Sequence, residues 1–454
     1  MADRIGGWGT IVGGAILGLA GVARGAEDRH VLVISIDGLP GRYLRDPKVN
    51  LPTIRKLAAE GAVAEGGMVV SNPSVTWPNH TSMMTGVHAD RHGVLYNGTV
   101  ERNGPGKSPR VVFAARTQAE LVRVPLLFDV LGKAGMGSAA INWPCTRGST
   151  SIADNFPDVP EALKYTSEPL KAALDDLGYV ARFDKGSAVV RDDAWVAATR
   201  EAILKRKPRL IALHLLNLDG THHRHGPESP EGYKAAEGED ANVGKILDAL
   251  SEAGLRDRTS VFVVSDHGFA GVPRTIRPNA IFRREGLIRR EGKEIRSARV
   301  FSVAEGGIAM VFLNDPATAV EDRATVTRLL AGAEGIASVI SPEDYAKYHF
   351  PQPSEHDGMP GLVLAAKDGY GFSGEDEGDE LVVDNKNPHA GSHGFLSTEP
   401  KMRATFVASG PGIKRGATLD AVEIVDLAPT FAAILGVDPG PVAGRKLEEI
   451  LDLR

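Results

Sequence analysis

Three aspartates in this 454-residue sequence stand at the ends of apolar runs that are typical of buried strands. The runs HVLVISID, PRLIALHLLNLD and TSVFVVSD end at Asp37, Asp219 and Asp266. An unpaired carboxylate is costly to bury, and the carboxyl ends of parallel strands meet at one edge of a sheet, where ligands bind. We therefore expect the three carboxylates to lie along one edge of a sheet, at a ligand site.

Three histidines accompany these aspartates. His223 follows Asp219 by four residues, His267 adjoins Asp266, and His393 lies in the glycine-flanked segment GSHGF. Alone, a loop histidine is more often a surface or core residue, and a strand-terminal aspartate more often caps a helix. Together they could form two mixed carboxylate and imidazole sites, a ligand set that suits zinc better than iron or manganese.

Thr76 is the candidate nucleophile. It lies in SNPSVTWPNHTSMMTG (71–86), at a turn where Pro78 is placed to start a helix. A hydroxyl at a helix N-terminus lies in positive potential, which favours its ionised form and an incoming anion. A metal ion on the oxygen would lower its pKa further. The alternative interpretation of Thr76 is an ordinary helix cap.

Apolar runs typical of strands alternate with segments of helical periodicity along the chain. The predicted strands are 30–37, 137–144, 208–219, 259–266, 306–314, 361–367 and 404–410, and the predicted helices are 51–62, 124–135, 233–255 and 422–436. This alternation predicts an α/β sandwich of three layers with a mostly parallel central sheet. Segments 98–120 and 272–304 have the weakest periodicity, and we expect them to be insertions near the site entrance within a single catalytic domain, 27–454.

The N-terminal segment differs from the rest of the chain. Residues 6–23 carry no charge and lead into small residues, so 1–26 is predicted to be a signal peptide or an N-terminal anchor of an exported protein, periplasmic or extracellular. No later stretch is long enough to span a membrane. The net charge of -6 gives no basic surface for nucleic acid. Cys145 is the only cysteine, so an intrachain disulfide is excluded. We expect Cys145 to be a buried or loop thiol.

Taken together and in their order along the chain, the motifs around these aspartates, histidines and Thr76 resemble the alkaline phosphatase superfamily and, within it, the nucleotide pyrophosphatase/phosphodiesterase family. The resemblance extends from VLVISIDGLP to GRKLEEIL. Its most specific parts are TWPNHTSMMTG (76–86), the D-x-x-x-H-x-x-G-P frame of 219–227, SDHG (265–268) and GSHG (391–394). The resemblance implies an alkaline-phosphatase-like fold and a hydrolase that uses two zinc ions per chain.

The family pattern also implies a role for each matching residue. One zinc ion would be held by Asp219, His223 and His393, and the other by Asp37, Asp266 and His267, with Thr76 Oγ as a further ligand. Asn97, in HGVLYNGTV, matches the family asparagine that donates to a phosphoryl oxygen. The backbone N–H of Thr76 or of its neighbour would be a second donor.

The histidines near Asp219 depart from the family pattern. His222 stands where the family usually has glycine, and either His222 or His225 could compete with His223 as the ligand. We interpret both as neighbours of the site or as surface residues. His80 and His92 have no spacing that marks them as ligands, so we interpret both as structural.

The implied activity is hydrolysis of a phosphodiester or pyrophosphate bond in a small, nucleotide-like substrate, through a phosphothreonine intermediate. Trp77, Tyr96 and Trp143 could stack on a base or cover a lipid glycerol, although aromatic residues of this kind are more often packing groups. The sequence does not indicate an oligomeric state.

Other functions remain as alternatives. A monoester hydrolase of the same superfamily would need extra positive charge, for which Arg147 is the candidate, and a phosphonate hydrolase would share the metal ligands. A sulfatase would need a C/S-x-P-x-R frame, but Cys145 is followed by Thr-Arg-Gly. A zinc-stabilised binding protein without turnover would not need Thr76 and Asn97.

Overall fold

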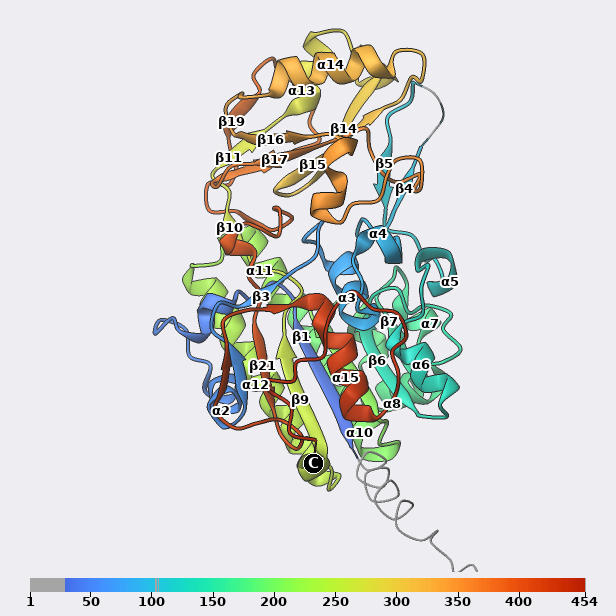
Figure 1. The fold of residues 1–454 in the computed structure, drawn as a ribbon, viewed down its shortest axis with the longest axis vertical. Helices are drawn as coiled ribbons and strands as arrows, with labels where there is room; N and C mark the ends of the chain where they lie inside the picture. Colours follow the sequence, from blue (N-terminus) through green and yellow to red (C-terminus); the bar gives the residue numbers. More distant parts are fainter. Residues whose placement is uncertain (1–28, 103, 105, 454) are drawn as a thin grey trace, which may run out of the picture.

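The computed structural model describes residues 29–453, except 103 and 105. The predicted signal or anchor segment, 1–26, lies outside the described residues. The described chain forms a larger lobe around a central sheet and a smaller lobe above it (Figure 1). Within this part of the chain, no helix combines the length and the apolar character that a membrane crossing requires.

The central sheet has eight strands and carries the site along one edge. Its order is β22 (Ala417–Leu419), β2 (Ala62–Ala64), β21 (Phe406–Ser409), β9 (Thr259–Val264), β1 (His30–Ile36), β8 (Leu210–Leu215), β6 (Ser138–Trp143) and β7 (Asp154–Pro157). Only β21 runs antiparallel to its neighbours, β2 and β9; the other pairs are parallel. The predicted mostly parallel sheet is therefore confirmed.

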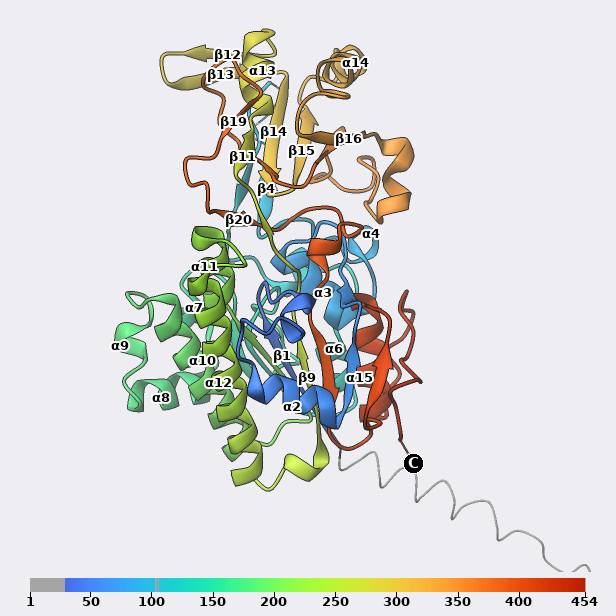
Figure 2. The same ribbon diagram turned by 90° about the vertical axis from the view of Figure 1, so that its left-hand side faces the viewer.

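Helices cover both faces of this sheet, as continuous apolar strands require. Along β1, Val31 and Val33 pack into one core, while Leu32 and Ile34 pack into the other. The first core is closed by α3 (Thr76–Thr85), α6 (Leu127–Lys133) and α15 (Leu427–Leu435), and the second by α2 (Pro52–Glu60), α8 (Glu168–Asp176), α10 (Ala188–Lys205) and α12 (Pro230–Glu252). Figure 2 shows the helix layers on opposite sides of the sheet, which confirms the three-layer sandwich.

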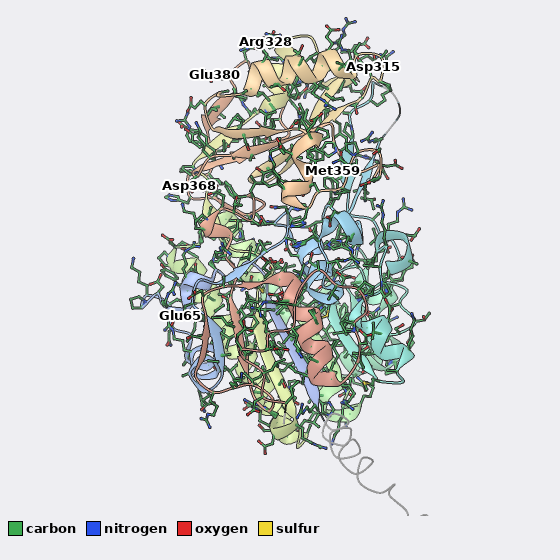
Figure 3. The ribbon with its side chains drawn as sticks, in the orientation of Figure 1. Glu65, Asp315, Arg328, Met359, Asp368 and Glu380 are labelled. Carbon is green, nitrogen blue, oxygen red and sulfur yellow. The ribbon has the colours of Figure 1, made fainter. Side chains whose placement is uncertain are left out.

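The smaller lobe contains a four-stranded antiparallel sheet of its own. Its order is β14 (Val300–Glu305), β15 (Ile308–Leu313), β17 (Leu362–Ala366) and β16 (Ile336–Ile340), accompanied by α13 (Pro278–Arg284) and α14 (Ala319–Leu330). Figure 3 labels Asp315, Arg328, Met359, Asp368 and Glu380 in this lobe and Glu65 in the larger one. The sequence prediction that strands 306–314 and 361–367 continue the central series is wrong, because β15 pairs with β14 across a two-residue hairpin and with β17.

Both segments of weak periodicity lie beside or within the smaller lobe. Residues 272–304 include β11 (Arg274–Ile276), α13, β12 (Ile288–Glu291), β13 (Glu294–Ala298) and most of β14; β11 pairs with β18 (Tyr370–Phe372) and β19 (Val382–Asp384). Residues 98–120 form the hairpin of β4 (Thr99–Glu101) and β5 (Arg110–Val112) and the start of α5 (Gln118–Leu121). An apolar cluster that includes Leu95, Tyr96, Ile308 and Met310 joins the two lobes.

We expect Leu213→Ala to lower the free energy of unfolding by about 2–5 kcal/mol, because it leaves a cavity in the core. Leu213 lies on β8 and is 0% exposed. Leu177→Ala, at a side chain that is 57% exposed, is the matched control and should change stability by less than about 0.5 kcal/mol. Urea unfolding measures both; equal effects would contradict this description of the core.

Candidate functional site

Two of the predicted site aspartates follow neighbouring parallel strands that end side by side in the sheet. In the register of β1 and β9, Ser35 pairs with Val264, so the residues that follow these strands lie side by side. Asp37 and Asp266 are both fully buried. The backbone N–H of Gly38 donates to Asp266 Oδ1 over 3.2 Å, which links the two strand ends.

Asp219 reaches the same place from a helix. The predicted strand 208–219 is too long, because β8 ends at Leu215 and α11 (Asn217–His225) begins in the polar sequence that follows. Asp219 lies in the first turn of α11, and His223 lies one turn later on the same face. His223 Nε2 is 3.4 Å from Asp219 Oδ1.

His393 comes from a late loop that folds back over the site. It follows β20 (Gly391–Ser392), which pairs antiparallel with β10 (Ala270–Gly271), just beyond His267. The rings of His393 and His267 stack, with centroids 3.7 Å apart. His393 Nε2 lies 3.6 Å from Asp219 Oδ1. All six residues that the sequence proposed as ligands therefore converge on one place.

Backbone carbonyls fix the orientation of the three imidazoles. His223 Nδ1 faces the carbonyl oxygen of Gly391, His267 Nδ1 that of Gly268, and His393 Nδ1 that of Ser74, each over 3.1 Å. A carbonyl oxygen only accepts, so each Nδ1 must carry the proton. Each Nε2 then presents its lone pair to the carboxylates, which is the arrangement of histidine ligands in metal sites.

The spacing of these atoms suits a metal better than hydrogen bonding. His267 Nε2 lies 3.3 Å from Asp37 Oδ1 and 3.2 Å from Asp266 Oδ2. Two lone-pair atoms do not attract each other, whereas tetrahedral zinc with bonds of ~2.0–2.1 Å holds neighbouring ligand atoms about 3.3 Å apart. Among the described residues, Asp37 Oδ1, Asp219 Oδ1, Asp266 Oδ2 and His267 Nε2 are buried without a hydrogen-bond partner.

Within the described part of the chain, two groups of side chains are close enough to hold an ion, and they share Asp219. One group is Asp219, His223 and His393, and the other is Asp37, Asp219 and His267; within each, the ligand atoms lie within 4.8 Å of one another. The first group matches the set that the family resemblance implies. The second contains Asp219 where the resemblance implies Asp266, although Asp266 Oδ2 lies 3.2 Å from His267 Nε2 of the same group.

The electrostatics of the site also require positive charge. Burial, followed by the charges of Asp266 and Asp219, raises the pKa of Asp37 well above its usual value. Burial raises the pKa of Asp266 to about 7 and lowers the pKa of His267 to about 4. Burial also lowers the pKa of His393 well below its usual value, whereas for His223 burial is outweighed by the charge of Asp219 and by hydrogen bonds, and the pKa is raised. The imidazoles of His267 and His393 are therefore neutral near pH 7, and His223 alone cannot balance three carboxylates, so a cation would relieve the mutual repulsion. The site opens towards His223, whose side chain is 42% exposed, whereas Asp37 and His267 are 0% exposed.

Thr76 and Asn97 form a hydrogen-bonded pair at the start of α3. Thr76 is the first residue of the helix. Asn97 Oδ1 accepts the backbone N–H of Trp77 over 2.8 Å, and Asn97 Nδ2 donates to Thr76 Oγ1 over 3.2 Å. Because a backbone N–H fixes the amide orientation, the Asn97 NH₂ group faces the hydroxyl. The Trp77 N–H is engaged, which leaves the N–H of Thr76 as the backbone donor.

Two histidines of unassigned or structural role contact the site. His214, near the end of β8, places Nε2 3.0 Å from Asp37 Oδ2 and Nδ1 3.0 Å from the carbonyl oxygen of Asn142. His214 was missed by the sequence prediction; the signal was a histidine inside an otherwise apolar strand. His80, which we interpreted as structural, bonds the carbonyl oxygen of Thr76 through Nδ1 over 2.9 Å and lies 3.7 Å from Asp266 Oδ2.

The three aromatic residues that could contact substrate are packed in the interior. Trp77 and Trp143 are each 1% exposed and Tyr96 is 2% exposed. Trp77 Nε1 donates to Asp158 Oδ2 over 2.8 Å, and the Tyr96 hydroxyl donates to the carbonyl oxygen of Gly358 over 2.7 Å. None of the three rings therefore offers an open face for stacking in this conformation, and their role in substrate binding stays a prediction.

Three other side chains that the sequence singled out face away from the cluster, and His225, the other histidine that could compete with His223, is exposed. His222 is fully buried and its Nε2 lies 3.0 Å from the Tyr43 hydroxyl, so it faces away from the cluster. The Arg147 guanidinium donates to the Ala115 carbonyl oxygen and lies over the Tyr165 ring at 4.2 Å. Cys145 is buried, and burial raises the pKa of its thiol to about 12.

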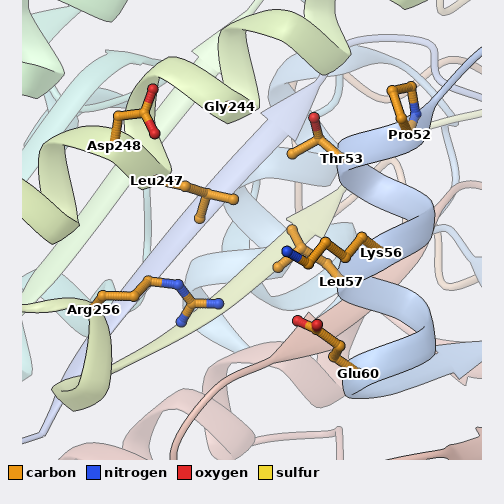
Figure 4. Close-up of a pocket in the computed structure, with 9 residues that line it drawn as sticks. All are labelled: Pro52, Thr53, Lys56, Leu57, Glu60, Gly244, Leu247, Asp248 and Arg256. Carbon is orange, nitrogen blue, oxygen red and sulfur yellow. The ribbon is translucent and has the colours of Figure 1, made fainter.

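A separate cavity of about 480 Å³ lies between α2 and α12 (Figure 4). Its lining includes Lys56, Glu60, Asp248 and Arg256, whose opposite charges face the same space. None of the predicted site residues lines this cavity, so it contributes nothing to the chemistry of the cluster.

Comparisons with known proteins identify the family of this chain. The family model described as type I phosphodiesterase / nucleotide pyrophosphatase matches residues 31–396. The chain is 22% identical to the Bos taurus bis(5'-adenosyl)-triphosphatase ENPP4, over 95% of this chain and 83% of that protein. It is 24% identical to Homo sapiens ectonucleotide pyrophosphatase/phosphodiesterase family member 1, over 92% of this chain but only 41% of that protein.

Solved structures show the same fold. Murine ectonucleotide pyrophosphatase/phosphodiesterase 5 superposes with a TM-score of 0.70 at 20% identity, covering 93% of this chain and 100% of that chain. The inactive threonine-to-alanine variant of that murine protein, in complex with AMP, gives a TM-score of 0.69. The family model spans most of the chain, and the fold is alkaline-phosphatase-like. This chain therefore belongs to the type I phosphodiesterase/nucleotide pyrophosphatase family of hydrolases, within the alkaline phosphatase superfamily.

Proposed function

We propose that this protein hydrolyses phosphodiester or pyrophosphate bonds with two zinc ions and with Thr76 as the nucleophile. The observation that carries the proposal is the convergence of six carboxylate and imidazole side chains that lack enough protons to satisfy one another. This cluster and the Thr76–Asn97 pair both lie at the carboxyl edge of the central sheet, where ligands bind in α/β folds.

The side chains fit zinc in number, type and orientation. Asp219, His223 and His393 would hold one ion, and Asp37, Asp266 and His267, together with Thr76 Oγ, would hold the other. When bound, the two ions would supply positive charge that lowers the pKa of a hydroxyl and stabilises the attacking and leaving oxygens of an in-line displacement. His214 would lie behind Asp37, with Nε2 3.0 Å from Asp37 Oδ2 and with Nδ1 donating to the Asn142 carbonyl oxygen over 3.0 Å.

The chemistry of the chain itself centres on Thr76. Its oxygen attacks phosphorus while the bond to the leaving oxygen breaks, which gives a phosphothreonine. Water then hydrolyses this ester from the opposite side, so two inversions give net retention at phosphorus. Asn97 Nδ2 and the Thr76 N–H donate to the equatorial oxygens, and the positive end of α3 adds to this stabilisation.

The substrate class follows from charge and from the relatives. The Arg147 guanidinium, which could have balanced the extra charge of a monoester, is held by Ala115 and Tyr165. One relative is named a bis(5'-adenosyl)-triphosphatase and a solved neighbour binds AMP, so we propose a small nucleotide-like substrate for this chain as well. We also propose that the protein is exported, since residues 1–26 have the pattern of a signal or anchor segment.

Thr76→Ala should lower kcat/KM for bis-p-nitrophenyl phosphate by roughly a thousandfold or more, because no other hydroxyl replaces the nucleophile. Zinc content should stay at two ions per chain, since the other ligands remain. Thr85→Ala, at a threonine in the same helix whose Oγ1 bonds the Thr81 carbonyl oxygen, should keep near-normal activity. Undiminished hydrolysis by Thr76→Ala would refute the nucleophile. Faster turnover of p-nitrophenyl phosphate or phosphonoacetate than of the diester would refute the substrate class.

Asn97→Asp should lower kcat/KM by about a hundredfold, because a carboxylate can still accept the Trp77 N–H but cannot donate to a phosphoryl oxygen and repels the anionic substrate. The melting temperature should change little, since the Trp77 bond is kept. Steady-state kinetics and thermal unfolding measure the two effects. An unchanged kcat/KM would remove Asn97 from the reaction.

Zinc affinity should rise as pH increases from 6 to 8. Burial raises the pKa of Asp266 to about 7, and a protonated carboxyl must lose its proton before it binds metal. The pKa of His267 is about 4, so this imidazole is already neutral at pH 6. Below pH 7 the affinity should fall roughly tenfold per pH unit for each proton displaced, as measured by competition with a chromophoric chelator.

The same titration has two controls. Removing zinc with EDTA should abolish activity and lower the melting temperature, because metal binds only the folded chain, and added zinc should restore both. Asp266→Asn, which cannot titrate, should bind zinc more weakly but with a shallower pH dependence. A protein that loses neither activity nor stability after EDTA would contradict the metal sites.

A further inference from the structure

Asp192 is a buried carboxylate beneath the helix that carries two of the proposed zinc ligands. It projects from α10 and is 1% exposed. Asp192 Oδ1 accepts the backbone N–H of Leu216, and Asp192 Oδ2 accepts that of Asn217, each over 3.0 Å. These N–H groups belong to the residue that caps α11 and to its first residue. Both oxygens of Asp192 therefore fix the start of α11, two residues before Asp219.

A second buried acid, Glu239 on α12, contacts Asp192. Glu239 is 1% exposed and hydrogen-bonds Asp192 side chain to side chain. Two carboxyl groups can share a hydrogen bond only if one carries a proton. Asp192 accepts two backbone N–H groups at the positive end of a helix, which favours its charged form. Glu239 accepts only the Asn242 amide, over 3.0 Å, so the proton resides on Glu239.

We propose that Asp192 is a positioning residue for the metal site: it fixes the first turn of α11 so that Asp219 and His223 meet His393 at ligand distance. This inference rests on the proposed two-zinc function. The protonated Glu239 supports Asp192 by donating a hydrogen bond to it, and thereby ties α12 to the same point. Three helices, α10, α11 and α12, are joined at this acid pair, although none of its atoms touches the ligand cluster.

The chain contains a matched control, a second buried aspartate that accepts two backbone N–H groups at the start of a helix. Asp240, the neighbour of Glu239, is 2% exposed and accepts the backbone N–H groups of Thr53 and Ile54 over 3.0 and 2.8 Å. It fixes the start of α2, which carries none of the proposed site residues. Asp192 and Asp240 thus have the same chemistry and burial. They differ in the helix whose start they bind: α11 carries proposed zinc ligands, and α2 does not.

The test compares Asp192→Asn with Asp240→Asn and Glu239→Gln in the full-length protein. An amide presents only one acceptor oxygen, so each asparagine loses one backbone N–H and should destabilise the zinc-free protein to a similar extent in urea unfolding. Asp192→Asn alone should lower the affinity for one of the two zinc ions by about 10–100-fold, as measured by chelator competition. Its kcat/KM should fall at limiting zinc and recover in excess zinc, a rescue that general damage to the fold would not give.

Glu239→Gln should leave both zinc affinities within about threefold of wild type. The glutamine amide can donate to Asp192 as the protonated acid does, and its oxygen can still accept from Asn242. If Asp192→Asn does not fold, Asp192→Ser, whose hydroxyl can accept one N–H, gives the same readout.

Three outcomes would overturn this proposal without contradicting the proposed function. Two zinc ions bound by Asp192→Asn with wild-type affinity would remove the positioning role and leave the proposed function intact. Equal weakening in Asp240→Asn would show a general effect of stability. If Glu239→Gln lowers zinc affinity as much as Asp192→Asn does, the charge would lie on Glu239 rather than on Asp192. A wild-type protein that binds no zinc would instead refute the proposed function, and with it the proposal.

Discussion

The structure depends on a shortage of protons among buried acids and imidazoles. Asp37, Asp219 and Asp266 are brought together at one edge of the central sheet, and the Nε2 atoms of three imidazoles face them; the imidazoles of His267 and His393 are neutral near pH 7. The imidazole Nδ1 protons face backbone carbonyls on the far side and so do not bond to these carboxylates. A cluster of this kind is unfavourable as a fold element and becomes favourable only around cations.

The surrounding protein orients each proposed ligand through contacts on its far side. Carbonyl oxygens of Gly391, Gly268 and Ser74 orient the imidazoles, His214 faces Asp37, and the Gly38 N–H holds Asp266. These contacts come from strand ends and short loops that the two apolar cores keep rigid. The site is therefore preorganised: the side chains do not need to rearrange to approach ligand spacing, and less conformational entropy is lost when metal binds.

The smaller lobe contributes to the site through backbone contacts. The N–H of Gly307, in the hairpin between β14 and β15, donates to the His393 carbonyl oxygen over 2.9 Å. The Gly394 N–H donates to the Ser74 carbonyl oxygen, which the His393 ring also contacts. On the other side, Tyr96, next to Asn97, packs in the apolar cluster that joins the lobes. The smaller lobe thus buttresses both the last histidine and the asparagine beside Thr76.

The sequence alone determined the fold class, the family and the identity of the converging residues, because these depend on local patterns. Apolar runs that stop at Asp37 and Asp266, the four-residue spacing of Asp219 and His223, and the turn before Thr76 are all readable within a few residues. The roles of these residues as ligands and nucleophile stay predictions. Only the tertiary structure decided which atoms face one another, that Asp219 lies on a helix, and that β15 and β17 form a separate sheet, because a short apolar run looks alike in either sheet. His214 and Asp192 contact partners from other elements of the fold, such as Asp37, 177 residues from His214. No local pattern encodes such contacts, since they exist only after the strands and helices have packed.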